Sequence, residues 1–198
     1  MFYRKSCNQL IKKYIPNILT LFRIFLVPVF IFQLLVIHDY FAALLVFALA
    51  SISDWADGYF ARKFNVASDF GAFFDPLADK FLVLSAFISF LYIESLSSIG
   101  SVELWMVIII AFRDLSITIL RIIINSKGNY KLITTNVAKI KTAFQLISIN
   151  FILLTLIVSS YFEFIYYLMV VTTGITFYTG FHYYYSNAKQ LSSILFNK

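Results

Sequence analysis

Residues 53–80, SDWADGYFARKFNVASDFGAFFDPLADK, carry five of the ten acidic residues in a chain of 198, and apolar stretches flank them on both sides. The whole chain is 61% hydrophobic and only 13% charged, with a mean hydropathy of +0.83. One water-soluble core cannot bury that much apolar surface. The acidic stretch therefore belongs to a membrane protein, where clustered carboxylates need a specific reason.

Apolar runs separated by short polar clusters divide the rest of the chain. Each run has about 20 residues and does not alternate in polarity, which predicts membrane-spanning helices and not barrel strands. We predict an all-α polytopic membrane protein with six transmembrane helices, near residues 15–37, 41–62, 70–92, 102–124, 133–158 and 164–185. They form one domain, residues 15–186, between a basic juxtamembrane segment (1–14) and a tail (187–198).

The positions of Lys and Arg predict the orientation of these helices. They occur in the N-terminal segment, in the turns after the second and fourth spans and in the tail, whereas the loops around HDY, ESLSSIGSVE and SSYFE contain none. Because cytoplasmic loops carry an excess of Lys and Arg, both termini and the acidic stretch are expected at the cytoplasmic face. The net charge of +6 then favours membrane lipids and phosphorylated substrates as partners, and not nucleic acid.

Helix geometry places the acidic residues on two stripes. At 100° per residue, Asp54 and Asp57 share one face of the second span with the small residues Gly58 and Ala61. On the third span, the spacing i, i+4, i+8 aligns three further residues, Gly71, Asp75 and Asp79. Two helices joined by a tight turn can face these stripes toward each other, which would produce four carboxylates beside an open space.

Four carboxylates at a membrane require compensation for their charge. Each costs about 2.5–3.5 kcal/mol within the hydrocarbon, and mutual repulsion adds to that cost. Oxygen ligands without a cysteine or histidine cluster suit Mg²⁺ or Mn²⁺ and not zinc. Two such ions held about 3.5–4 Å apart would serve phosphoryl displacement, and Arg62 at the cytoplasmic end would bind a phosphate.

These residues carry a resemblance to a known family. The pattern Asp54-x2-Asp57-Gly58-x2-Ala61-Arg62-x8-Gly71-x3-Asp75-x3-Asp79 resembles the signature of the CDP-alcohol phosphotransferases at every specified position. The resemblance implies six helices in a bacterial inner membrane, a homodimer as one arrangement, and transfer of a phosphatidyl group from CDP-diacylglycerol to an alcohol with release of CMP.

The resemblance also implies a role for each residue of the signature. Asp54, Asp57 and Asp75 would bind two metal ions, and Asp79 would contribute to the metal site and act as the base on the incoming hydroxyl. The CDP part of the donor would be accommodated by the remaining signature residues, Gly58, Ala61, Arg62 and Gly71.

The alcohol is indicated by residues outside the signature. The stretches IPNILTLFRIFLVPVF, WMVIIIAFRDLSITILR and AKIKTAFQ resemble the phosphatidylglycerophosphate synthases within this family, whose acceptor is glycerol 3-phosphate. Cationic side chains within spans are expensive and usually functional, and the candidates for binding the acceptor phosphate are Arg113, Arg121, Lys139 and Lys141. Alternatively, the two lysines mark only the membrane boundary.

Other interpretations remain open. An Arg-Asp pair at residues 113–114 also resembles cardiolipin synthases of the same superfamily, whose acceptor is phosphatidylglycerol. From a different class, an ion or proton transporter would use intramembrane carboxylates, but its acids would form a chain across the membrane and not a cluster at one face. A membrane scaffold with a metal-stabilised helix pair would leave the positions of Asp79 and Arg62 unexplained.

Overall fold

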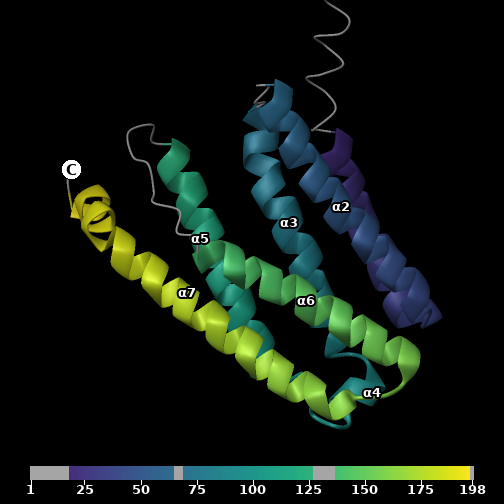
Figure 1. Ribbon diagram of the computed structural model, residues 1–198. Coiled ribbons are helices and arrows are strands. Elements are labelled where there is room, and N and C mark those ends of the chain that lie inside the picture. The colour runs from purple at the N-terminus through teal and green to yellow at the C-terminus, as the bar shows by residue number, and fades with distance from the viewer. Residues whose placement is uncertain (1–17, 65–68, 127–136, 197–198) are drawn as a thin grey trace, which may run out of the picture. The chain divides into compact units, whose positions relative to one another are not determined.

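The computed structural model describes residues 18–64, 69–126 and 137–196, which are helical except for short connections (Figure 1). The helices are Ile18–Ile37, whose last turn is the π-helix η1 (Gln33–Ile37), then α2 (Tyr40–Phe64), α3 (Asp69–Phe90), α4 (Glu94–Ser97), α5 (Leu104–Ser126), α6 (Val137–Val158) and α7 (Phe162–Phe196). These ranges contain no strand, so the predicted all-α class is confirmed for them. The predicted basic segment 1–14 lies outside the described residues.

The breaks between helices have local causes. His38 ends the first helix in the left-handed conformation, with φ of 59°. Asp39 Oδ1 then accepts a hydrogen bond of 2.9 Å from the backbone N–H of Ala42, which caps the start of α2. Between α6 and α7, Ser159 and Tyr161 also have positive φ, 55° and 67°, and the chain reverses there within a short connection.

The chain forms two compact units, residues 1–89 and 90–198. In the first unit, the helix Ile18–Ile37 packs against α2, and the rings of Phe30 and Phe47 lie 5.7 Å apart between centroids. Both phenylalanines are fully buried. This contact fixes which face of each helix is turned inward, and it is the face that carries Arg23 and Asp54 further along.

In the second unit, α7 packs along both α5 and α6, and Figure 1 shows α6 and α7 side by side. The hydroxyl oxygens of Ser148 on α6 and Thr172 on α7 are 2.6 Å apart in a buried hydrogen bond. Small polar residues at helix interfaces allow close approach and hydrogen bonding between membrane helices. The packing of this unit brings two of the predicted acceptor residues, Arg113 on α5 and Lys141 on α6, together at Asp114.

The outer surfaces of the helices are apolar, as expected for a protein in hydrocarbon. Phe112 on α5 and Phe181 on α7, for example, are 74% and 67% exposed. Among the described residues, three helices are long and apolar enough to cross a membrane: Ile18–Ile37, Ile140–Val158 and Phe162–Ala188. Two shorter apolar helical segments are also present in this part of the chain, Tyr40–Asp54 and Lys80–Phe90. A helical membrane protein is thus supported, while six spans and the orientation of the termini stay predictions. The last helix continues to Phe196, beyond the predicted end of its span.

Candidate active site

The backbone is helical at both groups of signature residues, as the predicted stripes require. Residues 54–62 lie within α2 and residues 71–79 within α3. Among the signature residues, the structure describes the side chain of Asp54 only. The side chains of the others, Asp57, Gly58, Ala61, Arg62, Gly71, Asp75 and Asp79, lie outside the described part of the chain, so the four-carboxylate cluster stays a prediction.

Asp54 forms an ion pair with Arg23 of the first helix. Arg23 Nη1 lies 2.9 Å from Asp54 Oδ1, the arginine side chain is fully buried, and the carboxylate is 45% exposed. A buried guanidinium requires an opposite charge, because an unpaired ion in an apolar interior is costly. The pair therefore gives the buried arginine an opposite charge, while the carboxylate stays accessible.

Asp54 also allows a test of whether a divalent cation suits this site. A carboxylate has about four lone-pair positions, so a guanidinium contact and metal coordination are compatible on one group. Its hard oxygen donors and partial exposure fit Mg²⁺ or Mn²⁺. Among the described side chains, which do not include those of Asp57, Asp75 and Asp79, no group of three or more acidic, histidine or cysteine residues could hold a metal ion.

A second polar cluster is built around Asp114 in the middle of α5. Asp114 is 1% exposed, and its Oδ1 accepts a hydrogen bond of 3.1 Å from Arg113 Nη1. Its Oδ2 accepts from Lys141 Nζ at 2.5 Å and from Gln145 Nε2 at 3.3 Å, both on α6. Among the described residues, the two cations Arg113 and Lys141 thus share the single carboxylate of Asp114.

The structure thus brings together two of the four predicted acceptor residues. Arg113 and Lys141 are 11% and 1% exposed at their side chains, and neither points freely into solvent. Arg121 lies eight residues further along α5, about 12 Å at the helical rise. Its guanidinium carbon sits 5.9 Å from the ring centroid of Tyr183. The side chain of Lys139 lies outside the described residues.

Several polar atoms near this cluster are buried without a hydrogen-bond partner among the described residues. They include Nε of Arg113, Nε of Arg121 and Oε1 of Gln145. Buried polar groups are nearly always hydrogen-bonded in folded proteins. Two guanidinium donors and one amide acceptor are therefore left for water or for a ligand to bind.

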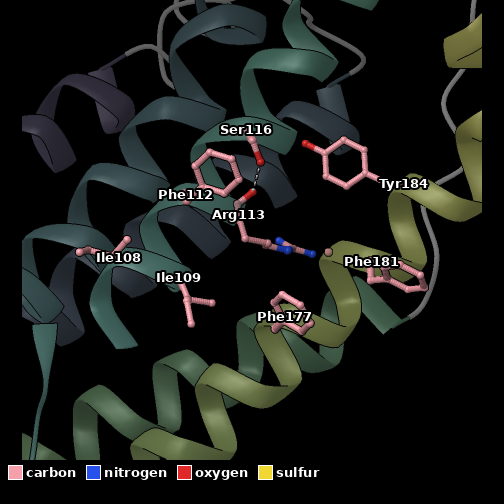
Figure 2. Close-up of a pocket in the computed structure, with 9 residues that line it drawn as sticks. Ile108, Ile109, Phe112, Arg113, Ser116, Phe177, Phe181 and Tyr184 are labelled. Carbon is pink, nitrogen blue, oxygen red and sulfur yellow. Dashed lines mark hydrogen bonds between the residues drawn. The ribbon is translucent and has the colours of Figure 1, made fainter. Parts of the chain in front are cut away.

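A cavity of about 320 Å³ opens beside Arg113 between α5 and α7. Figure 2 shows the Arg113 side chain extending from α5 toward α7, with Phe177 and Phe181 of α7 around its end. The remaining walls are largely aliphatic and aromatic, from residues such as Ile108 and Phe112. An arginine in the wall of an apolar groove could bind the charged group of a ligand whose remaining part is apolar.

The family is decided by comparison with known proteins. Residues 13–178 match the model of the CDP-alcohol phosphatidyltransferases, a range that contains every predicted site residue. The chain belongs to the CDP-alcohol phosphatidyltransferase family. It is therefore a transferase, as the signature at residues 54–79 predicts, and the predicted family is confirmed.

Among curated proteins, this phosphatidyltransferase is similar to two that bear the name CDP-diacylglycerol–glycerol-3-phosphate 3-phosphatidyltransferase. The protein of Bacillus subtilis (strain 168) is 36% identical over 155 residues, which cover 71% of this chain and 76% of the relative. That of Escherichia coli (strain K12) is 50% identical over 76 residues, which cover 37% of this chain and 42% of the relative. The second similarity is closer but spans less than half of either protein.

Three residues that contact these clusters were not predicted as site residues from the sequence. Arg23 pairs with Asp54, Gln145 binds Asp114, and Gly180 lies against Arg113. The position of Arg23 inside an apolar run could have predicted a functional role for it, since charged residues in such runs are usually functional. No signal in the sequence identified the partners of Gln145 or Gly180.

Proposed function

We propose that this phosphatidyltransferase transfers the phosphatidyl group of CDP-diacylglycerol to glycerol 3-phosphate, forming phosphatidylglycerol phosphate and CMP. The family and the names of the two relatives support the reaction. The observation that carries the choice of acceptor is the buried cluster around Asp114, in which Arg113 and Lys141 share one carboxylate and Nε of Arg113 lacks a hydrogen-bond partner among the described residues. A small dianion with hydroxyl groups matches that arrangement.

In this proposal the signature residues bind the donor. Asp54, Asp57, Asp75 and Asp79 would hold two divalent cations, which when bound neutralise the pyrophosphate of the donor. Arg23 keeps the Asp54 carboxylate in place through the 2.9 Å ion pair. Gly58, Ala61 and Gly71 leave space for the nucleotide, and the remaining signature cation, Arg62, binds a donor phosphate.

The acceptor residues would bind glycerol 3-phosphate, whose hydroxyl group attacks the phosphorus of the phosphatidyl group. Arg113 and Lys141, held by Asp114, attract the phosphate of glycerol 3-phosphate, and Arg121 adds a further guanidinium on the same helix. Gln145 Oε1, buried without a partner in the described part of the chain, is suited to accept a hydrogen bond from a glycerol hydroxyl. Holding both reactants in place supplies much of the rate enhancement.

Asp79 would act as the general base. Its carboxylate takes the proton of the primary hydroxyl as the oxygen forms a bond to the phosphatidyl phosphorus, and the bond from that phosphorus to the CMP oxygen breaks. The proton ends on Asp79, CMP leaves with the electron pair of the broken bond, and the new phosphodiester joins the two glycerols.

The same proposal extends to topology. Six spans with both termini in the cytoplasm, and a reaction at the cytoplasmic face of a bacterial inner membrane, are supported by the alternation of Lys and Arg between loops and by the bacterial sources of the relatives. Water-soluble glycerol 3-phosphate would reach the acceptor cluster from that side. A homodimer is part of the proposal by family resemblance.

A second candidate acceptor is phosphatidylglycerol, as in cardiolipin synthases. The observation that favours it is the apolar groove beside Arg113 (Figure 2), which would suit the acyl chains of a lipid acceptor. The buried polar atoms without a hydrogen-bond partner among the described residues favour a small polar molecule instead, so glycerol 3-phosphate remains the first choice.

The decisive experiment incubates the purified protein with CDP-diacylglycerol, Mg²⁺ or Mn²⁺, and one alcohol at a time: glycerol 3-phosphate, glycerol, inositol phosphate or phosphatidylglycerol. Products are identified by mass and CMP release is quantified, with excess EDTA as the control for metal dependence. We expect phosphatidylglycerol phosphate from glycerol 3-phosphate and almost nothing from glycerol. Cardiolipin from phosphatidylglycerol, with no reaction of glycerol 3-phosphate, would replace the first candidate by the second.

A further inference from the structure

Gly180 on α7 lies against the side chain of Arg113 on α5. A Cβ atom added at Gly180 would lie 2.8 Å from Cγ and 3.7 Å from Nε of Arg113. Carbon atoms attract each other best at about 3.5–4.0 Å, so a methyl group at residue 180 overlaps the arginine. The overlap involves Cγ, close to the α5 backbone, where the side chain cannot move aside by rotating its far end.

The position of Arg113 depends on this missing side chain. Its Nη1 is held by Asp114 Oδ1 at 3.1 Å, while the rest of the side chain crosses toward α7 in the groove shown in Figure 2. Its Nε is buried and lacks a hydrogen-bond acceptor in the described part of the chain. One edge of the guanidinium is thus fixed by Asp114, and another edge is left to bind an anionic oxygen.

We propose that Gly180 is a positioning residue of the acceptor site, because only glycine lets Arg113 cross to α7 with its guanidinium correctly placed. This inference rests on the proposed function, in which Arg113 binds the phosphate of glycerol 3-phosphate. It assigns a role in acceptor recognition to α7, a helix that carries none of the predicted site residues.

A second glycine of the same helix separates this role from ordinary helix packing. A Cβ atom added at Gly174 meets no atom within 4 Å, so α7 does not need glycine for its own course. Glycine is also a poorer helix former than alanine in a helix interior. Of these two glycines of α7, only residue 180 lacks room for a Cβ atom, and the atoms that a Cβ would meet there belong to Arg113.

The test compares four variants in one membrane-mimetic system: Gly180→Ala, Gly174→Ala, Arg113→Ala, and Arg113→Ala combined with Gly180→Ala. The quantities measured are kcat and the KM values for glycerol 3-phosphate and for CDP-diacylglycerol. We expect Gly180→Ala to raise the KM for glycerol 3-phosphate about ten-fold or more and to leave that for the donor within about two-fold. Gly174→Ala should behave like the wild type.

The double variant provides the control for direct contact. Arg113→Ala removes Cγ and Nε, leaving only Arg113 Cβ, which lies 3.9 Å from the added Cβ. Adding Gly180→Ala to Arg113→Ala should therefore change nothing further. Independent effects that multiply in the double variant would overturn the proposal, as would a rise in the donor KM in place of the acceptor KM.

Two other outcomes are also decisive. If Gly180→Ala alone does not fold, the double variant should fold and show the kinetics of Arg113→Ala, and failure of the double variant to fold would reject the contact as the cause. If the wild type does not use glycerol 3-phosphate, the proposed function fails. The coupling between residues 113 and 180 is then measured with whichever acceptor reacts, and lack of coupling there would reject the positioning role by itself.

Discussion

Arg23 and Asp54 join the first helix to α2 through an ion pair of 2.9 Å, in which the guanidinium is fully buried and the carboxylate is 45% exposed. The two side chains of this pair therefore differ in their access to a ligand. The buried arginine supplies a charge opposite to that of the carboxylate, and the exposed part of the carboxylate stays accessible for the metal binding proposed above.

Arg23→Met should weaken metal activation. Without the guanidinium, Asp54 loses the contact that orients it, and removing such a supporting partner typically costs 10- to 100-fold in metal affinity or activity. CMP release measured against Mn²⁺ concentration should show a half-saturating concentration at least about ten-fold higher than in the wild type. Arg23→Lys, which keeps a charge, is the matched control and should lie between the two. An unchanged metal dependence in a folded Arg23→Met protein would exclude this supporting role.

Asp57→Asn and Asp75→Asn should each abolish CMP release while the protein remains inserted and folded. Each replacement removes one charged oxygen ligand from the predicted two-metal site. Turnover is measured at saturating CDP-diacylglycerol, with size-exclusion chromatography as the check on folding. Retention of more than about a tenth of the wild-type turnover would contradict the assignment, because loss of a ligand usually costs at least ten-fold.

Asp79→Asn distinguishes a base from a metal ligand. If Asp79 takes the proton of the acceptor hydroxyl, turnover should fall by about 10²- to 10⁴-fold, while CDP-diacylglycerol still binds through the other signature residues. Binding is measured by titration with the donor in the presence of metal. A parallel loss of binding and turnover would make Asp79 chiefly a metal ligand.

Asp114→Asn should destabilise the second unit strongly. The Asp114 carboxylate, which is 1% exposed, pairs with both Arg113 and Lys141, and breaking a buried ion pair by removing one partner costs about 3–5 kcal/mol. Thermal unfolding in detergent should show a clear fall in Tm. Adding Lys141→Met should restore part of it, since one unpaired cation is then removed. Glu163→Gln, an exposed acid in the same unit, is the control and should change little.

Arg121→Ala should raise the KM for glycerol 3-phosphate and leave that for CDP-diacylglycerol nearly unchanged. A hydrogen bond to a charged group contributes about 1.5–3 kcal/mol, which corresponds to roughly 10- to 150-fold in kcat/KM. Steady-state kinetics with each substrate varied in turn provide the measurement. A Tyr183→Phe variant, which keeps the ring beneath the guanidinium, should retain most of the activity. A rise confined to the KM for CDP-diacylglycerol would instead assign Arg121 to the binding site of the donor.

Several features of this protein were determined by the sequence alone. The helical membrane class follows from apolar runs of about 20 residues, and the family follows from the spacing of residues 54–79. Both are properties of a continuous stretch of chain, because a helix forms its backbone hydrogen bonds within itself and its residues repeat at a fixed angle. The helical backbone of residues 54–62 and 71–79 agrees with that spacing.

Only the tertiary structure decided which side chains meet. Asp114 reaches Lys141 and Gln145 across 27 and 31 residues of sequence, Arg23 reaches Asp54 on another helix, and Gly180 makes room for Arg113. A charged residue within an apolar run predicts that the charge has a partner, but the sequence does not identify that partner. All faces of these helices carry apolar residues, so the hydrophobic pattern hardly distinguishes the buried face from the exposed face. The partner is selected by the packing of whole helices, which small residues and interhelical hydrogen bonds determine.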